Sequence, residues 1–215
     1  AYGHNEFIVC CGYKGYVIKE YFYHYFLHNS DMTVDLSNND LTIHNSNAEN
    51  FKVTLVDTGL ETMTAGRLKR VQQYIGEERF LLTYGDGVCD INMDEQLKFH
   101  EAKGAACTMS IVQPGSRFGM IGLDDQDTVT EFAEKPKEDG TWINGGFFIC
   151  EPKTFDYLPD DADNVMWERY PLEQLTADGQ LAAYRHEGFW KCMDTLRDNI
   201  DLNTMWEEHP KWKNW

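Results

Sequence analysis

One short polar segment of the chain could do phosphate chemistry. Tyr84-Gly85-Asp86-Gly87 follows the apolar run 80–83. If that run is a buried strand, the Asp86 carboxylate lies at the carboxyl end of a sheet, where open α/β proteins bind ligands. The glycines on both sides leave room for a bulky ligand, and a hard carboxylate suits a Mg²⁺ ion that carries phosphates. We therefore expect a nucleotide site here if a second carboxylate joins Asp86.

Four other segments also place polar or glycine residues where an apolar run ends. Asp194 can share one Mg²⁺ ion with Asp86. Lys135 offers a point positive charge for a phosphate group. The glycines of Asn144-Gly145-Gly146 allow a sugar ring to approach the backbone closely. Arg67, near the start of an expected helix, can meet a phosphate or a base.

Each of these residues also has an ordinary structural explanation. Asp86 fits a turn, and Asp194 fits the N-cap of the last helix. Lys135 fits a solvated ion pair with the preceding glutamate, and Asn144-Gly145 fits a hairpin turn. Arg67 can simply solvate its helix. Taken one at a time, these explanations are the stronger ones, so the case for a site depends on the residues occurring together.

Composition excludes several classes of partner. The chain has 215 residues, of which 42% are hydrophobic, enough for one α/β domain with a substantial core. Its 19 basic and 36 acidic residues give a formal charge of −17, which disfavours nucleic acid and anionic membranes as partners. No apolar stretch approaches the length of a membrane span. The six cysteines show no C-x-x-C or zinc spacing, so we expect reduced thiols and a cytoplasmic protein.

Strands and helices alternate along much of the sequence, which predicts a single domain over 1–215 with a mixed, mostly parallel sheet. Strands are expected at 7–11 (buried), 53–56, 80–83, 106–112, 147–150 and 181–186, with helices at 15–27, 65–75, 94–102, 152–158, 171–178 and 196–206. Hairpins are expected at 33–44 and 118–132, and a turn at 189–195. Cys107 and Cys150 lie in apolar runs and are expected in the core.

The order of four strings carries a family resemblance. Tyr-Gly-Asp-Gly, Glu-Lys-Pro, Asn-Gly-Gly-Phe-Phe and Phe-Trp-x-x-Met-Asp-Thr occur here in the order and spacing of the sugar-phosphate nucleotidylyltransferases. The similarity includes 8–22 and 53–71 and extends from Phe7 to Trp212. It implies a Rossmann-like α/β fold of the nucleotide-diphospho-sugar transferase type. It is strongest to the members that use CTP and α-D-glucose 1-phosphate and make CDP-glucose for surface polysaccharide such as O-antigen.

The resemblance also implies roles for individual residues. Asp86 and Asp194 match the Mg²⁺-binding aspartates, and with Lys135, which grips the sugar phosphate, they form the expected catalytic set. The positions expected to contact substrate are Thr62, Arg67, Tyr84, Gly85, Glu134, Lys135, Asn144, Gly145 and Trp190. The family further implies a homo-oligomer, with a hexamer as the expected form. The tryptophans at 206, 212 and 215 can serve either a subunit interface or packing on their own domain.

One departure from the family pattern is as informative as the matches. The family opens with a strand, a G-G-x-G-T-R phosphate loop and a helix, and no Gly-x-Gly-Thr-Arg occurs in this sequence. We therefore expect the domain to be N-terminally incomplete and this chain alone to be inactive or unstable. The alternatives are a thymidylyl- or uridylyltransferase, a non-catalytic sugar-nucleotide-binding module, and a glycosyltransferase, although that class usually carries Asp-x-Asp where this chain has Gly-Asp-Gly.

Overall fold

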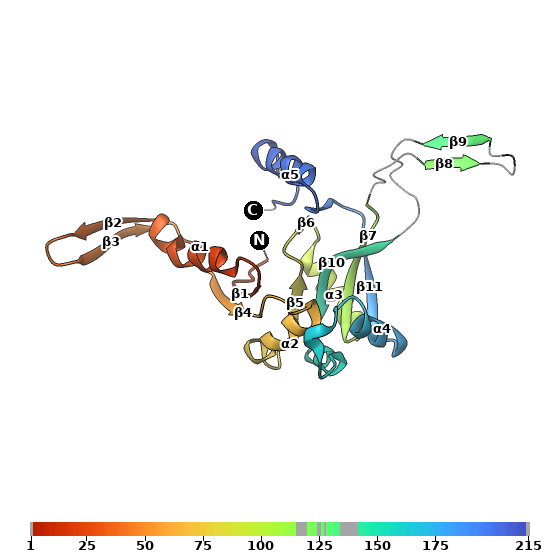
Figure 1. Ribbon diagram of the computed structural model, residues 1–215, viewed down its shortest axis with the longest axis horizontal. Coiled ribbons are helices and arrows are strands. Elements are labelled where there is room, and N and C mark those ends of the chain that lie inside the picture. Colours follow the sequence, from red (N-terminus) through yellow and green to blue (C-terminus); the bar gives the residue numbers. More distant parts are fainter. Residues whose placement is uncertain (1, 115–119, 124–125, 127, 134–141, 214–215) are drawn as a thin grey trace. The chain divides into compact units, whose positions relative to one another are not determined.

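The computed structural model describes residues 2–114, 120–123, 126, 128–133 and 142–213. The chain forms two compact units, and Figure 1 labels their helices and strands. Unit 1 comprises Ala1–Tyr2, Glu77–Thr154 and Leu175–Trp215, and unit 2 comprises Gly3–Gly76 and Phe155–Gln174. Among the described helices, none is both long and apolar enough to cross a membrane. The assignment of 1–215 to one domain stays a prediction.

Unit 1 is built on a four-stranded mixed sheet. Its order is β11 (Leu181–His186), β7 (Cys107–Val112), β10 (Ile143–Cys150) and β5 (Phe80–Thr83). β11 is parallel to β7, whereas β10 is antiparallel to both of its neighbours. Three of the four strands therefore run in one direction and β10 alone runs in the other. The predicted mixed α/β sheet is confirmed: β11 and β7 are parallel neighbours, and β10 separates them from β5.

Two smaller ladders and two helices complete the described part of unit 1. β6 (Gly87–Cys89) pairs with β12 (Trp190–Cys192), and β8 (Met120–Leu123) pairs with β9 (Val129–Ala133), both antiparallel. Helix α3 (Met93–Lys103) begins at Asn92, whose side chain accepts from two backbone N–H groups, and ends at Gly104 in the left-handed region. Helix α5 (Leu196–Glu208) follows β12. The sequence predicts both helices but neither β6 nor β12.

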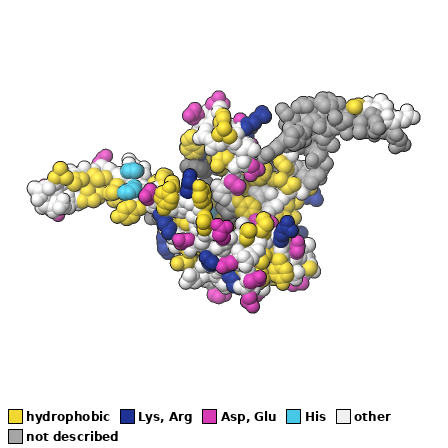
Figure 2. Space-filling view, viewed as in Figure 1, with side chains coloured by type: hydrophobic (Ala, Val, Ile, Leu, Met, Phe, Trp, Pro, Cys, Tyr) yellow, Lys and Arg dark blue, Asp and Glu magenta, His cyan; other side chains and the backbone are white. Residues whose placement is uncertain are grey.

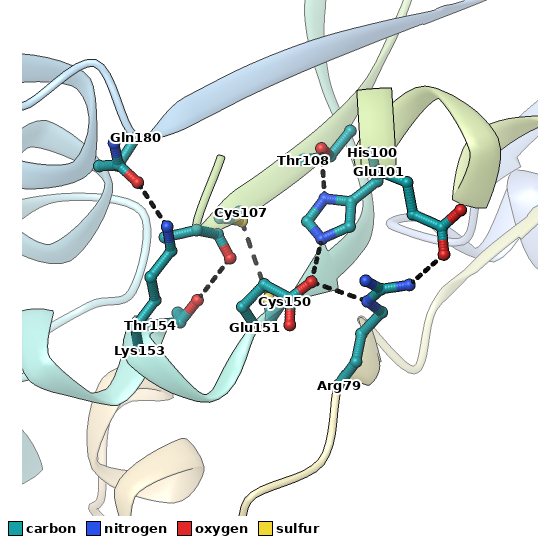
Figure 3. Close-up of polar contacts among 11 residues, drawn as sticks. Arg79, His100, Glu101, Cys107, Thr108, Cys150, Glu151, Lys153, Thr154 and Gln180 are labelled. Atoms are coloured by element: carbon teal, nitrogen blue, oxygen red, sulfur yellow. Dashed lines mark hydrogen bonds and ion pairs between the residues drawn. The ribbon is translucent and has the colours of Figure 1, made fainter. Parts of the chain in front are cut away.

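A buried histidine fixes α3 to the sheet (Figure 3). His100 is 1% exposed; its Nδ1 lies 2.7 Å from Thr108 Oγ1 and its Nε2 lies 3.0 Å from Glu151 Oε1. Arg79 Nε donates to the same Glu151 oxygen at 2.8 Å. Burial lowers the pKa of His100 and outweighs the neighbouring carboxylate. The imidazole is therefore neutral at pH 7, with its proton on Nε2, where the neighbour is an acceptor.

The core of unit 1 contains the two cysteines that the sequence places there. Cys107 and Cys150 face each other across β7 and β10, and both side chains are fully buried. Their sulfur atoms are 3.7 Å apart, as free thiols. Burial raises the pKa of the Cys150 thiol well above its ordinary value. Both residues thus act as small core side chains, as predicted.

Unit 2 contains a parallel strand pair, a hairpin and two longer helices. β1 (Glu6–Cys11) is parallel to β4 (Lys52–Asp57), and β2 (Ser30–Asp35) is antiparallel to β3 (Asp40–Ser46). The helices and 3₁₀ turns with residues in this unit are α1 (Gly15–His28), α2 (Thr64–Ile75), η1 (Pro152–Tyr157), η2 (Ala162–Asn164) and α4 (Tyr170–Ala177). The prediction that β1 is buried is wrong: only Cys11 is buried, because β4 is its one partner among the described strands.

Helix α1 and the β2–β3 hairpin expose an unusual number of large apolar side chains, visible in Figure 2. We call this set the aromatic face; it consists of Tyr16, Val17, Tyr21, Tyr23 and Phe26 on α1, and Val34 and Leu41 on the hairpin. These side chains point to several sides of α1, and this much exposed apolar surface on a folded domain commonly marks an interaction surface. By contrast, α2 buries its apolar stripe, including Leu68 and Val71, within unit 2.

Candidate functional site

Asp86 lies in a turn between two strands of unit 1. The apolar run Phe80–Thr83 forms β5, the turn follows at Gly85 and Asp86, and β6 begins at Gly87. Asp86 is exposed, as is Gly85. The turn is the structural role that the sequence offers for Asp86, and it leaves the carboxylate accessible to a ligand.

The segment that carries Asp194 lies beside Asp86. β12 pairs with β6 so that Cys192 is opposite Gly87. Beyond this ladder the Met193 amide donates a hydrogen bond of 2.8 Å to the carbonyl oxygen of Asp86. The structure therefore brings together the two aspartate segments that the sequence predicts to act together.

Asp194 precedes the last helix but does not cap it. Thr195 is the N-cap residue: its hydroxyl accepts from the Asp198 amide at 3.2 Å, and the Asp198 carboxylate accepts from the Thr195 amide at 3.0 Å. This reciprocal pair is a capping box. The alternative role of Asp194 as the helix cap is therefore wrong. The exposed Asp194 carboxylate has another contact, because the Cys192 thiol donates to its Oδ2 at 3.2 Å.

The donor chemistry of this pair fits Mg²⁺. Asp86 and Asp194 supply carboxylate oxygens, the hard ligands that Mg²⁺ prefers. Within the described residues, no group of three or more His, Cys, Asp or Glu side chains forms a metal centre. A site with one or two carboxylates, completed by water and substrate phosphates, is the usual arrangement for Mg²⁺ in phosphate-transferring enzymes. The two aspartates can therefore hold a metal that arrives with a nucleotide.

Four of the predicted substrate-contacting residues cluster around β10. Asn144 Nδ2 donates to Tyr84 Oη at 3.2 Å, and Trp190 Nε1 donates to the carbonyl oxygen of Gly145 at 2.7 Å. Asn144 and Gly145 lie in β10, so their alternative role as a hairpin turn is wrong. Residues from β10, β12 and the end of β5 thus meet in one polar cluster.

Gly146 makes this cluster possible. Its φ angle is +79°, in the left-handed region that favours glycine, and a Cβ there would lie 2.7 Å from Tyr84 Cδ2. The Gly146 amide donates to Asn144 Oδ1 at 2.8 Å, and the Tyr84 amide donates to the Gly146 carbonyl at 3.2 Å. The pairing of β10 with β7 shifts register between Asn144 and Phe148. This irregularity turns the Asn144 side chain back toward Tyr84.

Thr62 and Arg67 belong to unit 2 and lie where β1 and β4 end. Arg67 Nη1 donates to Thr58 Oγ1 at 2.7 Å, and Nη2 donates to the Leu60 carbonyl at 3.3 Å. The fully buried Thr58 in turn donates from Oγ1 to the Cys11 carbonyl at 2.9 Å. The guanidinium is therefore held at the carboxyl ends of two parallel strands, the edge at which such sheets bind ligands.

The structure adds one residue to the predicted set and leaves two outside it. Thr58 orients Arg67. The sequence feature that could have identified Thr58 is its position in the polar loop after the predicted strand 53–56. Glu134 and Lys135 lie outside the described residues. Their predicted roles at the sugar phosphate therefore rest on the family resemblance alone.

Comparison with known proteins supports the fold and the chemistry. A family model described as nucleotidyl transferase matches residues 33–208. The glucose-1-phosphate cytidylyltransferases of Salmonella typhi and Salmonella typhimurium are each 48% identical over 216 residues, covering 100% of this chain and 83% of theirs. The crystal structure of HddC from Yersinia pseudotuberculosis gives a TM-score of 0.65 at 20% identity, over 95% of this chain and 80% of that one. At that identity the structural likeness concerns the fold alone.

Proposed function

This chain belongs to the nucleotidyl transferase family, and we propose that it transfers a cytidylyl group from CTP to α-D-glucose 1-phosphate, giving CDP-glucose and pyrophosphate. The choice of CTP and glucose 1-phosphate rests on the relatives that carry this activity in their names and share 48% of the sequence over the whole chain. The observation that carries the proposal is the Met193–Asp86 hydrogen bond of 2.8 Å, which joins the two aspartate segments.

The reaction forms one P–O bond and breaks another. A phosphate oxygen of glucose 1-phosphate attacks the α-phosphorus of CTP, and the bond from that phosphorus to the bridging oxygen breaks to release pyrophosphate. The attacking oxygen is already ionised, so the protein does not need a general base. Its task is to hold the two anionic substrates in line and to offset the charge that gathers at the α-phosphate.

Asp86 and Asp194 would hold a Mg²⁺ ion, which neutralises phosphate charge when it is bound. Both carboxylates are exposed. The β6–β12 ladder holds their backbones together before substrate arrives. Such preorganisation lowers the free-energy cost of binding, because little ordering remains to be done.

The remaining residues divide between the two substrates. Lys135 would hold the incoming sugar phosphate, with Glu134 and Gly145 at the sugar. Asn144, Tyr84 and Trp190 form the polar cluster beside them, in which a sugar hydroxyl can find both donors and acceptors. In unit 2, Arg67 would meet the nucleotide, as would Thr62, which lies in the loop between β4 and α2.

We also infer that the protein is a homo-oligomer, and propose a hexamer. The aromatic face supports this, because large aromatic side chains are typical of subunit interfaces and are seldom left in contact with water together. The reaction belongs in the cytoplasm, where CTP is found, and the six cysteines are free thiols as such a location requires.

Product analysis tests the proposed reaction. The protein that contains this chain is incubated with glucose 1-phosphate, Mg²⁺ and each of CTP, UTP, dTTP and ATP in turn, and nucleotide sugars are separated by chromatography. CDP-glucose should form from CTP at a kcat/KM at least tenfold above that of any other nucleotide sugar. Faster formation of UDP- or dTDP-glucose would assign the protein to a different base.

A further inference from the structure

The β6–β12 ladder is closed at its far end by a second set of contacts. We call the residues Asp90, His186, Gly188 and Phe189 the clamp. The Phe189 amide donates to Asp90 Oδ1 at 2.7 Å, and the Asp90 amide donates to the Phe189 carbonyl at 3.1 Å. Asp90 directly follows β6 and Phe189 directly precedes β12. The clamp therefore fixes the end of the ladder opposite to Asp86 and Asp194.

His186 completes the clamp with a definite proton position. Its Nε2 lies 3.1 Å from Asp90 Oδ1 and 3.1 Å from the Phe189 carbonyl oxygen. Both neighbours are acceptors, so Nε2 must carry a proton and donate to them. His186 is the last residue of β11, and it is buried. One imidazole N–H thus ties the small ladder to the edge strand of the four-stranded sheet.

Gly188 is required by the closeness of these groups. A Cβ at this position would lie 2.3 Å from Asp90 Oδ1 and 2.7 Å from His186 Cε1. Real Cβ atoms are essentially never found so close to another heavy atom, so any side chain at position 188 would push the carboxylate and the imidazole away. Substitution here opens the clamp without changing either partner.

The ladder needs such a clamp because it is short. β6 and β12 have three residues each, and the Met193–Asp86 bond is the next contact beyond them. A slip of one residue in an antiparallel pair moves every side chain to the opposite face. In this ladder a slip would also part the two aspartate segments.

We propose that Asp90 and His186 are positioning residues that set the β6–β12 register and thereby hold Asp86 and Asp194 ready for the metal. The link between the clamp and catalysis rests on the proposed function. The proposal concerns a structural relationship, however, that can be measured without turnover. The clamp residues lie at the end of the ladder opposite to the two aspartates, so they act on them through the ladder.

Three variants and a control test the proposal in the protein that contains this chain. Asp90→Ala removes the acceptor, Gly188→Ala displaces it, and His186→Ala removes the second donor. The matched control is Glu101→Gln, which alters an exposed carboxylate of unit 1 that pairs with Arg79 at 2.8 Å, away from the ladder. A fourth variant, His186→Gln, restores an N–H donor and should recover most of what His186→Ala loses.

Two readouts report directly on the ladder. Amide hydrogen exchange at Met193, followed by NMR, should become at least tenfold faster in the three clamp variants. Binding of Mn²⁺ in place of Mg²⁺, followed by electron paramagnetic resonance, should weaken by about tenfold. Thermal unfolding should stay cooperative throughout, and Glu101→Gln should match the wild type in all three measurements.

The outcomes distinguish failure of the clamp proposal from failure of the proposed function. Unchanged Met193 exchange in folded Asp90→Ala and Gly188→Ala would overturn the proposal, as would equal losses in His186→Ala and His186→Gln. If Asp90→Ala fails to fold, the Gly188 and His186 variants decide the question alone. If the wild type makes no CDP-glucose but the exchange results hold, the proposed function fails and the clamp stands.

Discussion

The indole Nε1 of Trp190 donates a hydrogen bond of 2.7 Å to the carbonyl oxygen of Gly145. This bond joins β12 to β10, and β12 leads directly to Asp194. The polar cluster around Tyr84 and the aspartate pair are therefore attached to the same short strand. A ligand that contacts the cluster and a metal that binds the aspartates would therefore both contact residues on or next to β12.

Loss of the indole donor should weaken sugar-phosphate binding. In Trp190→Phe an aromatic ring remains but the hydrogen bond to Gly145 is lost, at a cost of about 1 kcal/mol. We expect the KM for glucose 1-phosphate to rise about fivefold, with the KM for CTP little changed. Trp206→Phe, at an exposed position on α5, is the control. Equal kinetics in Trp190→Phe and wild type would remove Trp190 from the substrate side.

A methyl group at Gly146 should disturb the same cluster from the backbone. Gly146→Ala combines a left-handed backbone with a clash at Tyr84 and should lower the free energy of unfolding by about 1–3 kcal/mol. The control Gly179→Ala has φ +64° but open space around its Cβ, so it isolates the backbone term. Urea unfolding measures the loss of stability in both variants. In steady-state kinetics, only Gly146→Ala should show a raised KM for glucose 1-phosphate. A rise in both variants would exclude a specific role for the Tyr84 contact.

Neutralising either aspartate should abolish most activity while leaving the fold intact. Asp86→Asn and Asp194→Asn each remove one negative metal ligand, and a loss of about 3 kcal/mol in transition-state stabilisation lowers kcat about a hundredfold. The exposed Asp156→Asn should behave as wild type. Circular dichroism checks the fold, and titration with Mn²⁺ checks the metal. Full activity in either aspartate variant would contradict the metal site.

The buried His100 should make stability depend on pH below neutrality. Its pKa is lowered in the folded state, while an unfolded histidine titrates near pH 6.5. As pH falls through about 6.5, His100 becomes protonated in the unfolded chain but stays neutral in the folded chain. The free energy of unfolding therefore decreases by at most about 1.4 kcal/mol per pH unit. Stability at pH 7 is thus the higher value, and it is lost on acidification.

Urea unfolding between pH 7.5 and 5.5 measures this dependence. His100→Gln cannot take up a proton and should show a flatter profile than the wild type over that range. His209→Gln, at an exposed position after α5, should keep the wild-type slope. The Glu151 carboxylate does not confuse the result: burial raises its pKa, but Arg79 and His100 outweigh burial and hold it below the ordinary value. Its titration therefore lies below this range.

A charge on the aromatic face should dissociate the proposed homo-oligomer. Tyr21→Glu places a carboxylate among exposed apolar side chains of α1, where burial in an interface would be costly. We expect the sedimentation coefficient to fall to that of the monomer. Tyr74→Glu changes an exposed tyrosine of α2 in the same way and should leave assembly unchanged. An oligomer that survives Tyr21→Glu must form through another surface.

The long elements follow from sequence pattern, whereas the elements that join the aspartates do not. The apolar run 80–83 is confirmed as β5, and the 15–27 periodicity is confirmed as α1. β6 and β12 have three residues each, with no alternating pattern. Strands this short form only when they pair with a partner strand, and here each partner lies about a hundred residues away in the sequence. A local pattern cannot reveal this pairing.

The sequence contains a pattern that identifies Thr195, and not Asp194, as the N-cap of the last helix. Asp194 and Thr195 are both good N-cap residues. Asp198 stands three residues after Thr195 and completes a capping box with it. The spacing therefore already favoured Thr195 as the cap and left Asp194 for another task. Asn144-Gly145 could not be resolved in this way, because its place in β10 follows from pairing with β7, a segment distant in the sequence.

The β6–β12 ladder also has a consequence for biosynthesis. More than one hundred residues separate Asp86 from Asp194, so a ribosome must synthesise β7, β10 and β11 before the second aspartate segment emerges. A nascent chain that exposes only Asp86 cannot yet complete the proposed metal pair. Contacts of such long sequence separation form late and slowly. Under the proposed function, the pair can therefore begin to bind Mg²⁺ only after Asp194 has emerged.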